Sequence, residues 1–97
     1  MASRTFRSEP FRRLVASLPC QHCGAYGRTQ AAHRNEGKGM GIKTSDALVA
    51  ALCVECHAEL DNGKSMTKVE RREFWNRVYI STIKTLIEQN LLVVGEQ

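Results

Sequence analysis

Four cysteines arranged in two C-x-x-C pairs are the residues of this sequence best suited to chemistry. Cys20 and Cys23 form the first pair, and Cys53 and Cys56 form the second. Zinc favours four tetrahedral nitrogen or sulfur ligands, and two such pairs supply them as two bidentate halves separated in sequence. The spacing therefore predicts one structural zinc ion, which would close residues 24–52 into a loop.

Two redox-active or buried cysteine pairs are the alternative interpretation. A thioredoxin-like site normally presents one C-x-x-C motif in a βαβ unit, whereas this chain carries two motifs and no such unit. Structural zinc can contribute on the order of 10 kcal/mol to the folding of a small domain. For a chain of 97 residues that contribution would decide whether it folds. His22 lies inside the first pair and is predicted to be an exposed side chain rather than a ligand.

A second group of candidate residues consists of His33, His57 and Asp61. His57 follows Cys56 on a predicted helix and Asp61 lies four residues later, so both side chains project from one face and can share a cation. His33 ends a predicted strand, where a neutral imidazole can activate a water molecule. Each has a structural alternative. His33 can be an ordinary structural histidine, His57 can pack beside the zinc site or donate to a thiolate, and Asp61 can simply begin an Asp-Asn-Gly turn.

The elements that position these residues follow from hydrophobic spacing and from turn and capping signals. Pro19–Gly24 has the form of a zinc knuckle, a turn whose backbone N–H groups point at thiolates, with Gly24 in the left-handed conformation. The predicted elements are a helix over 9–17, hairpin arms over 28–33 and 48–52, a helix from Cys53 to Leu60, and a long helix from the Thr67–Glu70 capping box to Asn90. The fold class is therefore small α+β, with an N-terminal helix and a long C-terminal helix.

The long helix carries an apolar stripe that predicts the main packing surface. Trp75 and Tyr79 lie on this stripe, so core packing is expected rather than stacking on nucleic-acid bases. Its arginines are mixed with acidic residues, which predicts a solvated face; the arginines are Arg71, Arg72 and Arg77, and the acidic residues are Glu70 and Glu73. A short extended tail, 91–94, is expected to pack back.

The charge of the chain is concentrated in its first half. Residues 1–45 carry eight basic and two acidic side chains, a net charge of +6, whereas the remainder carries six basic and eight acidic ones, a net charge of −2. A one-sided basic excess predicts a phosphate-backbone partner with salt-dependent binding. The connection 37–41 is glycine-rich and basic but lacks the P-loop pattern. The candidate nucleic-acid-binding residues are Arg4, Arg7, Arg12, Arg13, Arg34, Lys38 and Lys43.

Length and hydropathy predict one domain, residues 9–97, preceded by a basic N-terminal arm, residues 1–8. Residues 1–7 of this arm are expected to be loose, and Ser8 is the predicted N-cap of the first helix. No stretch contains the roughly 18 apolar residues that span a bilayer, and the N-terminus has no apolar signal core. The expected location is cytoplasmic, with no membrane partner. In that reducing compartment, cysteine pairs are expected to bind a metal ion rather than to form disulfides.

A knuckle, a hairpin bearing a histidine and a C-x-x-C-H helix together resemble the treble-clef, ββα-metal site of HNH endonucleases. The matching stretches lie within residues 20–61 and are Ala32–His33, Gly37–Lys43, Thr44–Leu48 and Leu52–Asp61. They look like two phage groups, the recombination-enhancement nucleases that act with the RecA recombinase and the YbcO-like prophage nucleases. The resemblance covers under half of the chain.

The resemblance implies a role for each matching residue. His33 would be the general base, Asp46 would take the middle position of the motif, and His57 and Asp61 would bind a catalytic cation, Mg²⁺ or Mn²⁺. That cation would neutralise the scissile phosphate and stabilise the leaving 3′ oxygen. The zinc would place His33 opposite the helix ligands.

Two positions depart from the family pattern. Many HNH enzymes place a metal ligand where this chain has Ala32, and Asp61 stands where histidine is frequent. Aspartate suits a hard cation. With alanine at position 32, however, the motif supplies only two protein ligands, and Asp46, Glu36 or substrate phosphate would have to help bind the cation.

The predicted function is a metal-dependent DNA endonuclease, encoded by a phage or prophage and acting in a bacterial host during recombination or DNA processing. Its partners would be double- or single-stranded DNA and a RecA-type recombinase filament. The alternatives are a catalytically inactive zinc-finger DNA-binding module and a zinc-stabilised protein-interaction domain.

Overall fold

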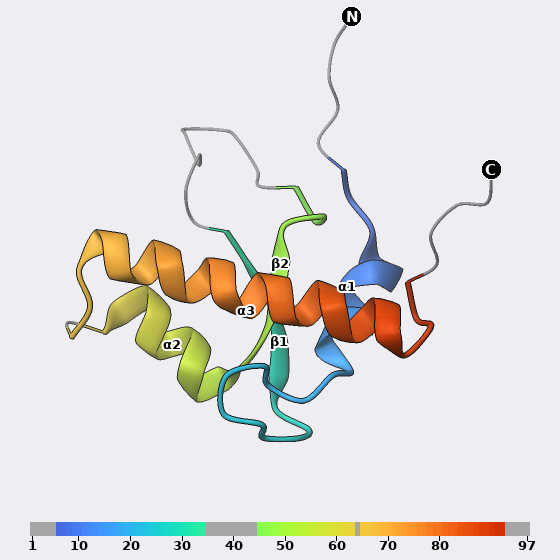
Figure 1. Ribbon diagram of the computed structural model, residues 1–97, viewed down its shortest axis with the longest axis horizontal. Helices are drawn as coiled ribbons and strands as arrows, with labels where there is room; N and C mark the ends of the chain where they lie inside the picture. The colour runs from blue at the N-terminus through green and yellow to red at the C-terminus, as the bar shows by residue number, and fades with distance from the viewer. Residues whose placement is uncertain (1–5, 35–44, 64, 93–97) are drawn as a thin grey trace, which may run out of the picture.

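The computed structural model describes residues 6–34, 45–63 and 65–92, and Figure 1 shows their arrangement. The elements are α1 (Glu9–Ala16), β1 (Thr29–His33), β2 (Val49–Cys53), α2 (Val54–Asn62) and α3 (Lys68–Glu88). The structure confirms the small α+β fold class and the predicted order of elements. Among the helices that these residues form, none combines the length and apolarity that crossing a membrane requires.

The two strands form an antiparallel hairpin whose register fixes the direction of the candidate residues. Ala31 pairs with Ala51, and His33 pairs with Val49. Paired residues share a face of the sheet and successive residues alternate between faces. Gln30 and Ala32 therefore lie on one face, whereas Ala31 and His33 lie on the other.

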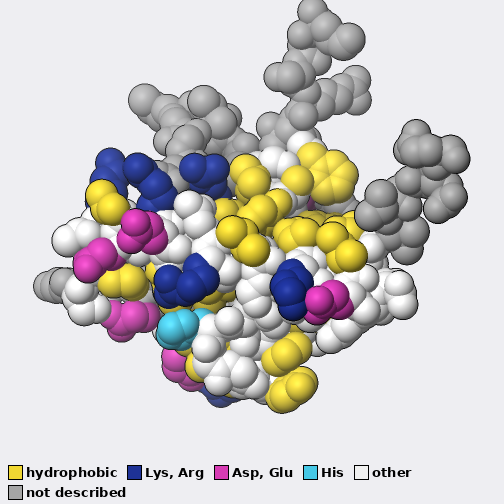
Figure 2. All heavy atoms as spheres, viewed as in Figure 1, with side chains coloured by type: hydrophobic (Ala, Val, Ile, Leu, Met, Phe, Trp, Pro, Cys, Tyr) yellow, Lys and Arg dark blue, Asp and Glu magenta, His cyan; other side chains and the backbone are white. Residues whose placement is uncertain are grey.

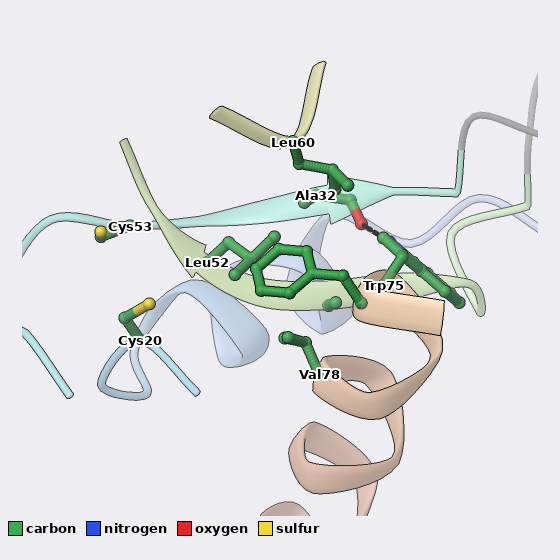
Figure 3. Packing of buried hydrophobic residues seen from close by; sticks show 9 residues of the cluster. Cys20, Ala32, Leu52, Cys53, Leu60, Trp75 and Val78 are labelled. Atoms are coloured by element: carbon green, nitrogen blue, oxygen red, sulfur yellow. Dashed lines mark hydrogen bonds between the residues drawn. The ribbon is translucent and has the colours of Figure 1, made fainter. Parts of the chain in front are cut away.

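Each face of the hairpin supports its own part of the core. Ala32 and Leu52 pack with Leu60 of α2 and with the N-terminal half of α3, as Figure 3 shows for Trp75 and Val78. The other face carries a second cluster, whose buried members are Val15, Leu18, Val49, Ala51 and Leu86. The long helix α3 crosses the hairpin, and α1 and α2 lie on opposite sides of the hairpin (Figure 1). It therefore contributes to both clusters.

Trp75 fixes α3 against the hairpin by a buried hydrogen bond. Its Nε1–H donates to the carbonyl of Ala32 at 3.0 Å (Figure 3). Its ring stacks on Tyr79 with centroids 4.8 Å apart, and the Tyr79 hydroxyl donates to the carbonyl of Ala47 at 2.9 Å. The core role predicted for these two aromatic residues is confirmed.

The helix ends agree with the sequence signals except at α2. Thr67 and Glu70 form the predicted capping box, with Thr67 N–H donating to Glu70 Oε1 at 2.7 Å and Glu70 N–H to Thr67 Oγ1 at 3.1 Å. The helix α2 continues to Asn62 and closes with Gly63 N–H donating to the carbonyl of Glu59 at 2.8 Å. Asp61 is thus helical, and the alternative that it begins a turn is wrong.

The described end of the N-terminal arm is held by hydrogen bonds, which makes the prediction of a loose arm wrong for residues 6 and 7, whereas the predicted N-cap role of Ser8 is confirmed. Asp46 N–H donates to the carbonyl of Phe6 at 2.8 Å, and Ser8 N–H donates to Asp46 Oδ2 at 2.7 Å. Ser8 also caps α1 by accepting from Phe11 N–H at 3.2 Å. Residues 1–5 lie outside the described part of the chain.

The start of the C-terminal tail folds back. Asn90, with φ of +60°, ends α3 in the left-handed conformation. The N–H groups of Leu91 and Leu92 then donate to the carbonyl of Leu86 at 2.9 and 3.1 Å, and Leu92 packs against the second cluster. The tail packs back as predicted, but residues 91 and 92 form a bend rather than an extended segment; residues 93 and 94 lie outside the described residues.

Replacing Thr82 with valine is expected to destabilise the fold by about 1 to 3 kcal/mol, because it leaves a buried backbone donor unpaired. Thr82 is buried, and its Oγ1 accepts from Ala51 N–H at 3.0 Å while donating to the carbonyl of Val78 at 2.8 Å. Denaturant unfolding measures the loss. Thr85→Val, at a half-buried position of the same helix, is the control, and equal losses in the two variants would contradict the prediction.

Candidate functional site

The four cysteines form one cluster with the size of a metal site. Their Sγ atoms all lie within 4.8 Å of one another, and those of Cys23 and Cys53 are 3.7 Å apart. Zinc–sulfur bonds of 2.3 Å in a tetrahedron place the sulfur atoms about 3.8 Å apart. The donor set and its spacing therefore fit a single metal ion held by four thiolates.

Backbone geometry builds both halves of the cluster. The N–H groups of His22 and Cys23 each donate to Cys20 Sγ at 3.4 Å, and Gly24 adopts a φ of +83°. In the second half, Cys53 ends β2 and caps α2, and its Sγ accepts from Cys56 N–H at 3.5 Å. The knuckle turn predicted from the sequence is confirmed.

The thiols of the cluster differ in acidity. Burial alone would raise the pKa of Cys20, but backbone N–H groups, that of Cys23 foremost, outweigh it and bring this pKa to about 6. Burial, reinforced by hydrogen bonds from the neighbouring cysteines, raises the pKa of Cys56 above its usual value. Without a cation, the cluster thus favours a single thiolate. A bound cation would offset the electrostatic repulsion among four thiolates.

His22 is exposed beside this cluster, as predicted. Its ring packs edge-on against Phe74, with centroids 4.7 Å apart. A cavity of about 340 Å³ lies next to it, and its lining includes His22, Cys56, Met66 and Phe74. Phe74 therefore supports the knuckle from α3.

His33 is held by a buried carboxylate. Its Nε2 lies 2.7 Å from Oδ1 of Asp46, a side chain with no exposed surface. The same carboxylate accepts from Ser8 N–H at 2.7 Å and from Arg12 Nε–H at 2.9 Å, and Arg7 Nη1 lies 3.3 Å from it. His33 is thus oriented by a residue 13 positions away that is itself fixed by α1 and the segment before it.

The partners of Asp46 keep it ionised. Burial alone would raise the pKa of Asp46, but the hydrogen bonds from His33 and Ser8 and the charges of Arg7 and Arg12 lower it to about 2. A carboxylate that remains charged accepts the Nε2 proton of a neutral His33 ring. The lone pair of that ring is then on Nδ1.

Acidification is expected to remove about 2 kcal/mol of stability through Asp46. Its pKa is about 2 in the folded chain against an ordinary 3.8. The stabilisation is therefore complete above pH ~4 and is lost as the pH falls through ~2.

Denaturant unfolding of the wild type and Asp46→Asn at a series of pH values checks this loss. Cadmium-loaded protein suits the measurement, because a softer metal holds thiolates more tightly against protons. The difference between the two proteins should be constant at higher pH and shrink below pH ~4. A difference that stays constant throughout would contradict the assignment.

His57 and Asp61 form the predicted pair on one face of α2. His57 Nε2 lies 3.2 Å from Asp61 Oδ2, and His57 Nδ1 lies 2.8 Å from Oε1 of Gln30 on β1. The two ring nitrogens thus contact Gln30 and Asp61 rather than a cysteine thiolate. The sequence analysis missed Gln30. Its place two residues before Ala32, on the strand face covered by α2, is the signal that could have found it.

His33 and His57 belong to two separate pairs rather than to one cluster. Gln30, which contacts His57, and His33 point to opposite faces of β1 and are three residues apart, about 10 Å along the strand. Within the part of the chain that the structure describes, the cysteine cluster is the only group of three or more histidine, cysteine or acidic side chains placed to share an ion. The predicted assisting residue Glu36 lies outside the described residues.

The basic residues predicted to bind nucleic acid have several settings. Arg7 and Arg12 contact Asp46, Arg13 is exposed and pairs with Glu9 at 2.7 Å, and Arg34 directly follows β1. Arg4, Lys38 and Lys43 lie outside the described residues. Arg7 and Arg12 thus bring positive charge to the His33 end of the hairpin.

The solvated face predicted on α3 is confirmed for two of its three arginines. Arg72 and Arg77 are exposed, and Arg77 lies over the ring of Phe74 at 5.5 Å. Arg71 is half-buried and donates to the carbonyl of Gly63. Figure 2 shows basic side chains above the N-terminal half of α3 and hydrophobic ones above its C-terminal half.

The chain thus combines a four-cysteine cluster with two histidine–carboxylate pairs. Cys53 joins the cluster to both β2 and α2, so the cluster and the hairpin share this residue. No family model, curated protein or solved structure matches this chain.

Proposed function

We propose that this protein is a metal-dependent DNA endonuclease of the HNH type, built on a zinc-stabilised treble clef. The observation that carries the proposal is the contact of 2.7 Å between His33 Nε2 and the buried carboxylate of Asp46. A carboxylate that holds one ring nitrogen fixes the tautomer of a histidine and stabilises the imidazolium it becomes as a general base. His33 would take a proton from the attacking water on Nδ1.

The surroundings of His33 suit a phosphodiester substrate. Arg7 and Arg12 place two guanidinium groups against the single carboxylate of Asp46, so these three side chains carry a net charge of +1. A positive surplus beside the base attracts a DNA backbone and makes binding weaken as salt rises. The resemblance to phage nucleases supports a role in recombination or DNA processing in the bacterial cytoplasm.

The cysteine cluster supports the treble-clef part of the proposal. A knuckle supplies Cys20 and Cys23, the hairpin follows, and α2 begins at the second pair. That order is the one the family resemblance implies. Zinc is the metal we propose for this site, because four thiolates in a closed tetrahedron are typical of structural zinc.

His57 and Asp61 are the residues that would hold the catalytic cation. Ligands about 2.1 Å from an octahedral ion lie about 3.0 Å apart in neighbouring positions, and the two atoms of this pair are 3.2 Å apart. When bound, Mg²⁺ or Mn²⁺ would neutralise the phosphate and stabilise the leaving oxygen. Water and substrate phosphate would supply its other ligands.

A catalytically inactive zinc DNA-binding module is the second candidate function. Ala32 stands where many HNH enzymes carry a ligand, and it is fully buried in the core. The placement of Gln30 and His33 on opposite faces of β1 also favours this candidate, because base and cation must reach the same phosphate.

A nicking assay separates the two functions. Zinc-loaded protein is incubated with supercoiled or single-stranded DNA, with Mg²⁺, Mn²⁺ or no added metal, and binding is measured in parallel at increasing salt. Metal-dependent cleavage is the expected result. Salt-sensitive binding without cleavage, across metals and DNA forms and with or without a recombinase filament, would support the binding module. Absence of both would contradict both candidates.

A further inference from the structure

The His57 ring lies between two hydrogen-bond acceptors. Its Nδ1 is 2.8 Å from the amide oxygen of Gln30, and its Nε2 is 3.2 Å from a carboxylate oxygen of Asp61. A neutral imidazole carries a single N–H and can donate to only one of them. The position of that proton decides what the other nitrogen can bind.

In the neutral ring, the shorter contact assigns the proton to Nδ1. The Gln30 oxygen can only accept, so the 2.8 Å contact requires an N–H on that side of the ring. The lone pair of Nε2 in this neutral tautomer then faces the Asp61 carboxylate, and a cation that both can bind would stabilise two electron-pair donors 3.2 Å apart. Histidines that bind metals usually donate their second N–H to a carbonyl or carboxylate in this way.

The core holds this arrangement in place. Leu60, three residues after His57, is buried against the same face of the hairpin, and Gln30 pairs with Leu52 in the strand register. The relative position of α2 and β1 is therefore set by packing. His57 is one-quarter exposed and Asp61 slightly more than one-third exposed, so a hydrated ion can approach the pair.

We propose that Gln30 is a positioning residue that locks His57 in its Nδ1–H tautomer and makes Nε2 and Asp61 a two-ligand clamp for a divalent cation such as Mn²⁺. The inference rests on the cation site of the proposed function. It concerns cation binding without DNA, so it can fail or hold independently of cleavage. Gln30 itself does not touch the ion.

The test measures the tautomer and the metal separately. Long-range ¹H–¹⁵N spectra of zinc-loaded, histidine-labelled protein identify the protonated nitrogen of His57, and loss of the free Mn²⁺ signal in electron paramagnetic resonance gives the affinity. Gln30→Met keeps the length of the side chain and removes the acceptor. Gln30→Glu keeps an acceptor, and Gln89→Met is the matched control at the exposed C-cap of α3.

The wild type, Gln30→Glu and Gln89→Met are expected to show the Nδ1–H tautomer and to bind Mn²⁺. Gln30→Met should lose that single tautomer and bind Mn²⁺ about 10 to 100 times more weakly, with unchanged circular dichroism. An Nε2–H tautomer in the wild type, no Mn²⁺ binding by the wild type, or equal affinities in the wild type and Gln30→Met would each overturn the proposal. Absence of DNA cleavage with these results intact would count against the nuclease instead.

Discussion

Cys53→Ser is expected to leave the chain largely unfolded, and a strong chelator is expected to unfold the wild type in the same way. Cys53 is buried, ends β2, caps α2 and contributes one of the four clustered thiols. Structural zinc supplies on the order of 10 kcal/mol in small domains, which is comparable to the whole stability of a typical domain. Removing one of the four thiols thus removes a contribution as large as the stability that the rest of the fold is expected to supply.

Metal analysis and thermal unfolding check this expectation. The wild type should contain about one zinc ion per chain and lose its cooperative transition when chelated, whereas Cys53→Ser should lack both the zinc and the transition. Ala58→Ser makes an exposed change on the same helix and should behave as the wild type does. A chelated wild type that melts at an unchanged temperature would show that the fold does not need the metal.

The sequence was sufficient to predict the elements and the cysteine cluster. Both depend on short-range patterns, such as the spacing of Cys20 and Cys23 and the capping box at Thr67, and both strands lie within one residue of their predicted bounds. The cysteine cluster is predictable because each of its two halves is local in sequence, and a shared zinc ion would require only that the halves meet.

The contacts that surround the histidines could not be predicted, because they join segments far apart in the chain. Ser8 and Arg12 reach Asp46 across 38 and 34 residues, and nothing in the local sequence of Asp46 indicates that α1 will bury it. Gln30 meets His57 across 27 residues. The sequence spacing around a single polar residue on a strand does not indicate which distant residue it will contact.

The end of α2 shows the limit of a turn signal. Asp61, Asn62 and Gly63 predict a turn, yet the first two continue the helix and only Gly63 leaves it. Turn propensity is a weak preference that neighbouring contacts override. Asp61 gains a contact with His57 one turn earlier, at 3.2 Å, by staying helical.

His33→Ala is expected to lower the rate of DNA cleavage by about 10² to 10⁴, the usual contribution of a general base, while DNA affinity changes little. The side chain is 27% exposed and its Nε2 is held by Asp46, so the substitution removes the proposed proton acceptor and leaves in place Arg7 and Arg12, the proposed phosphate contacts. Single-turnover cleavage of supercoiled DNA with Mn²⁺ measures the rate, and salt-dependent binding measures the affinity.

His22→Ala is the matched control, because His22 is an exposed histidine beside the cysteine cluster whose ring contacts Phe74. It should retain both cleavage and zinc. Loss of cleavage in His33→Ala together with loss of zinc would indicate unfolding and contradict a purely catalytic role. Equal rates in His33→Ala and the wild type would show that the 2.7 Å contact with Asp46 serves the structure alone. The general base would then have to be another residue. His57 is a poor candidate, because its two ring nitrogens already contact Gln30 and Asp61.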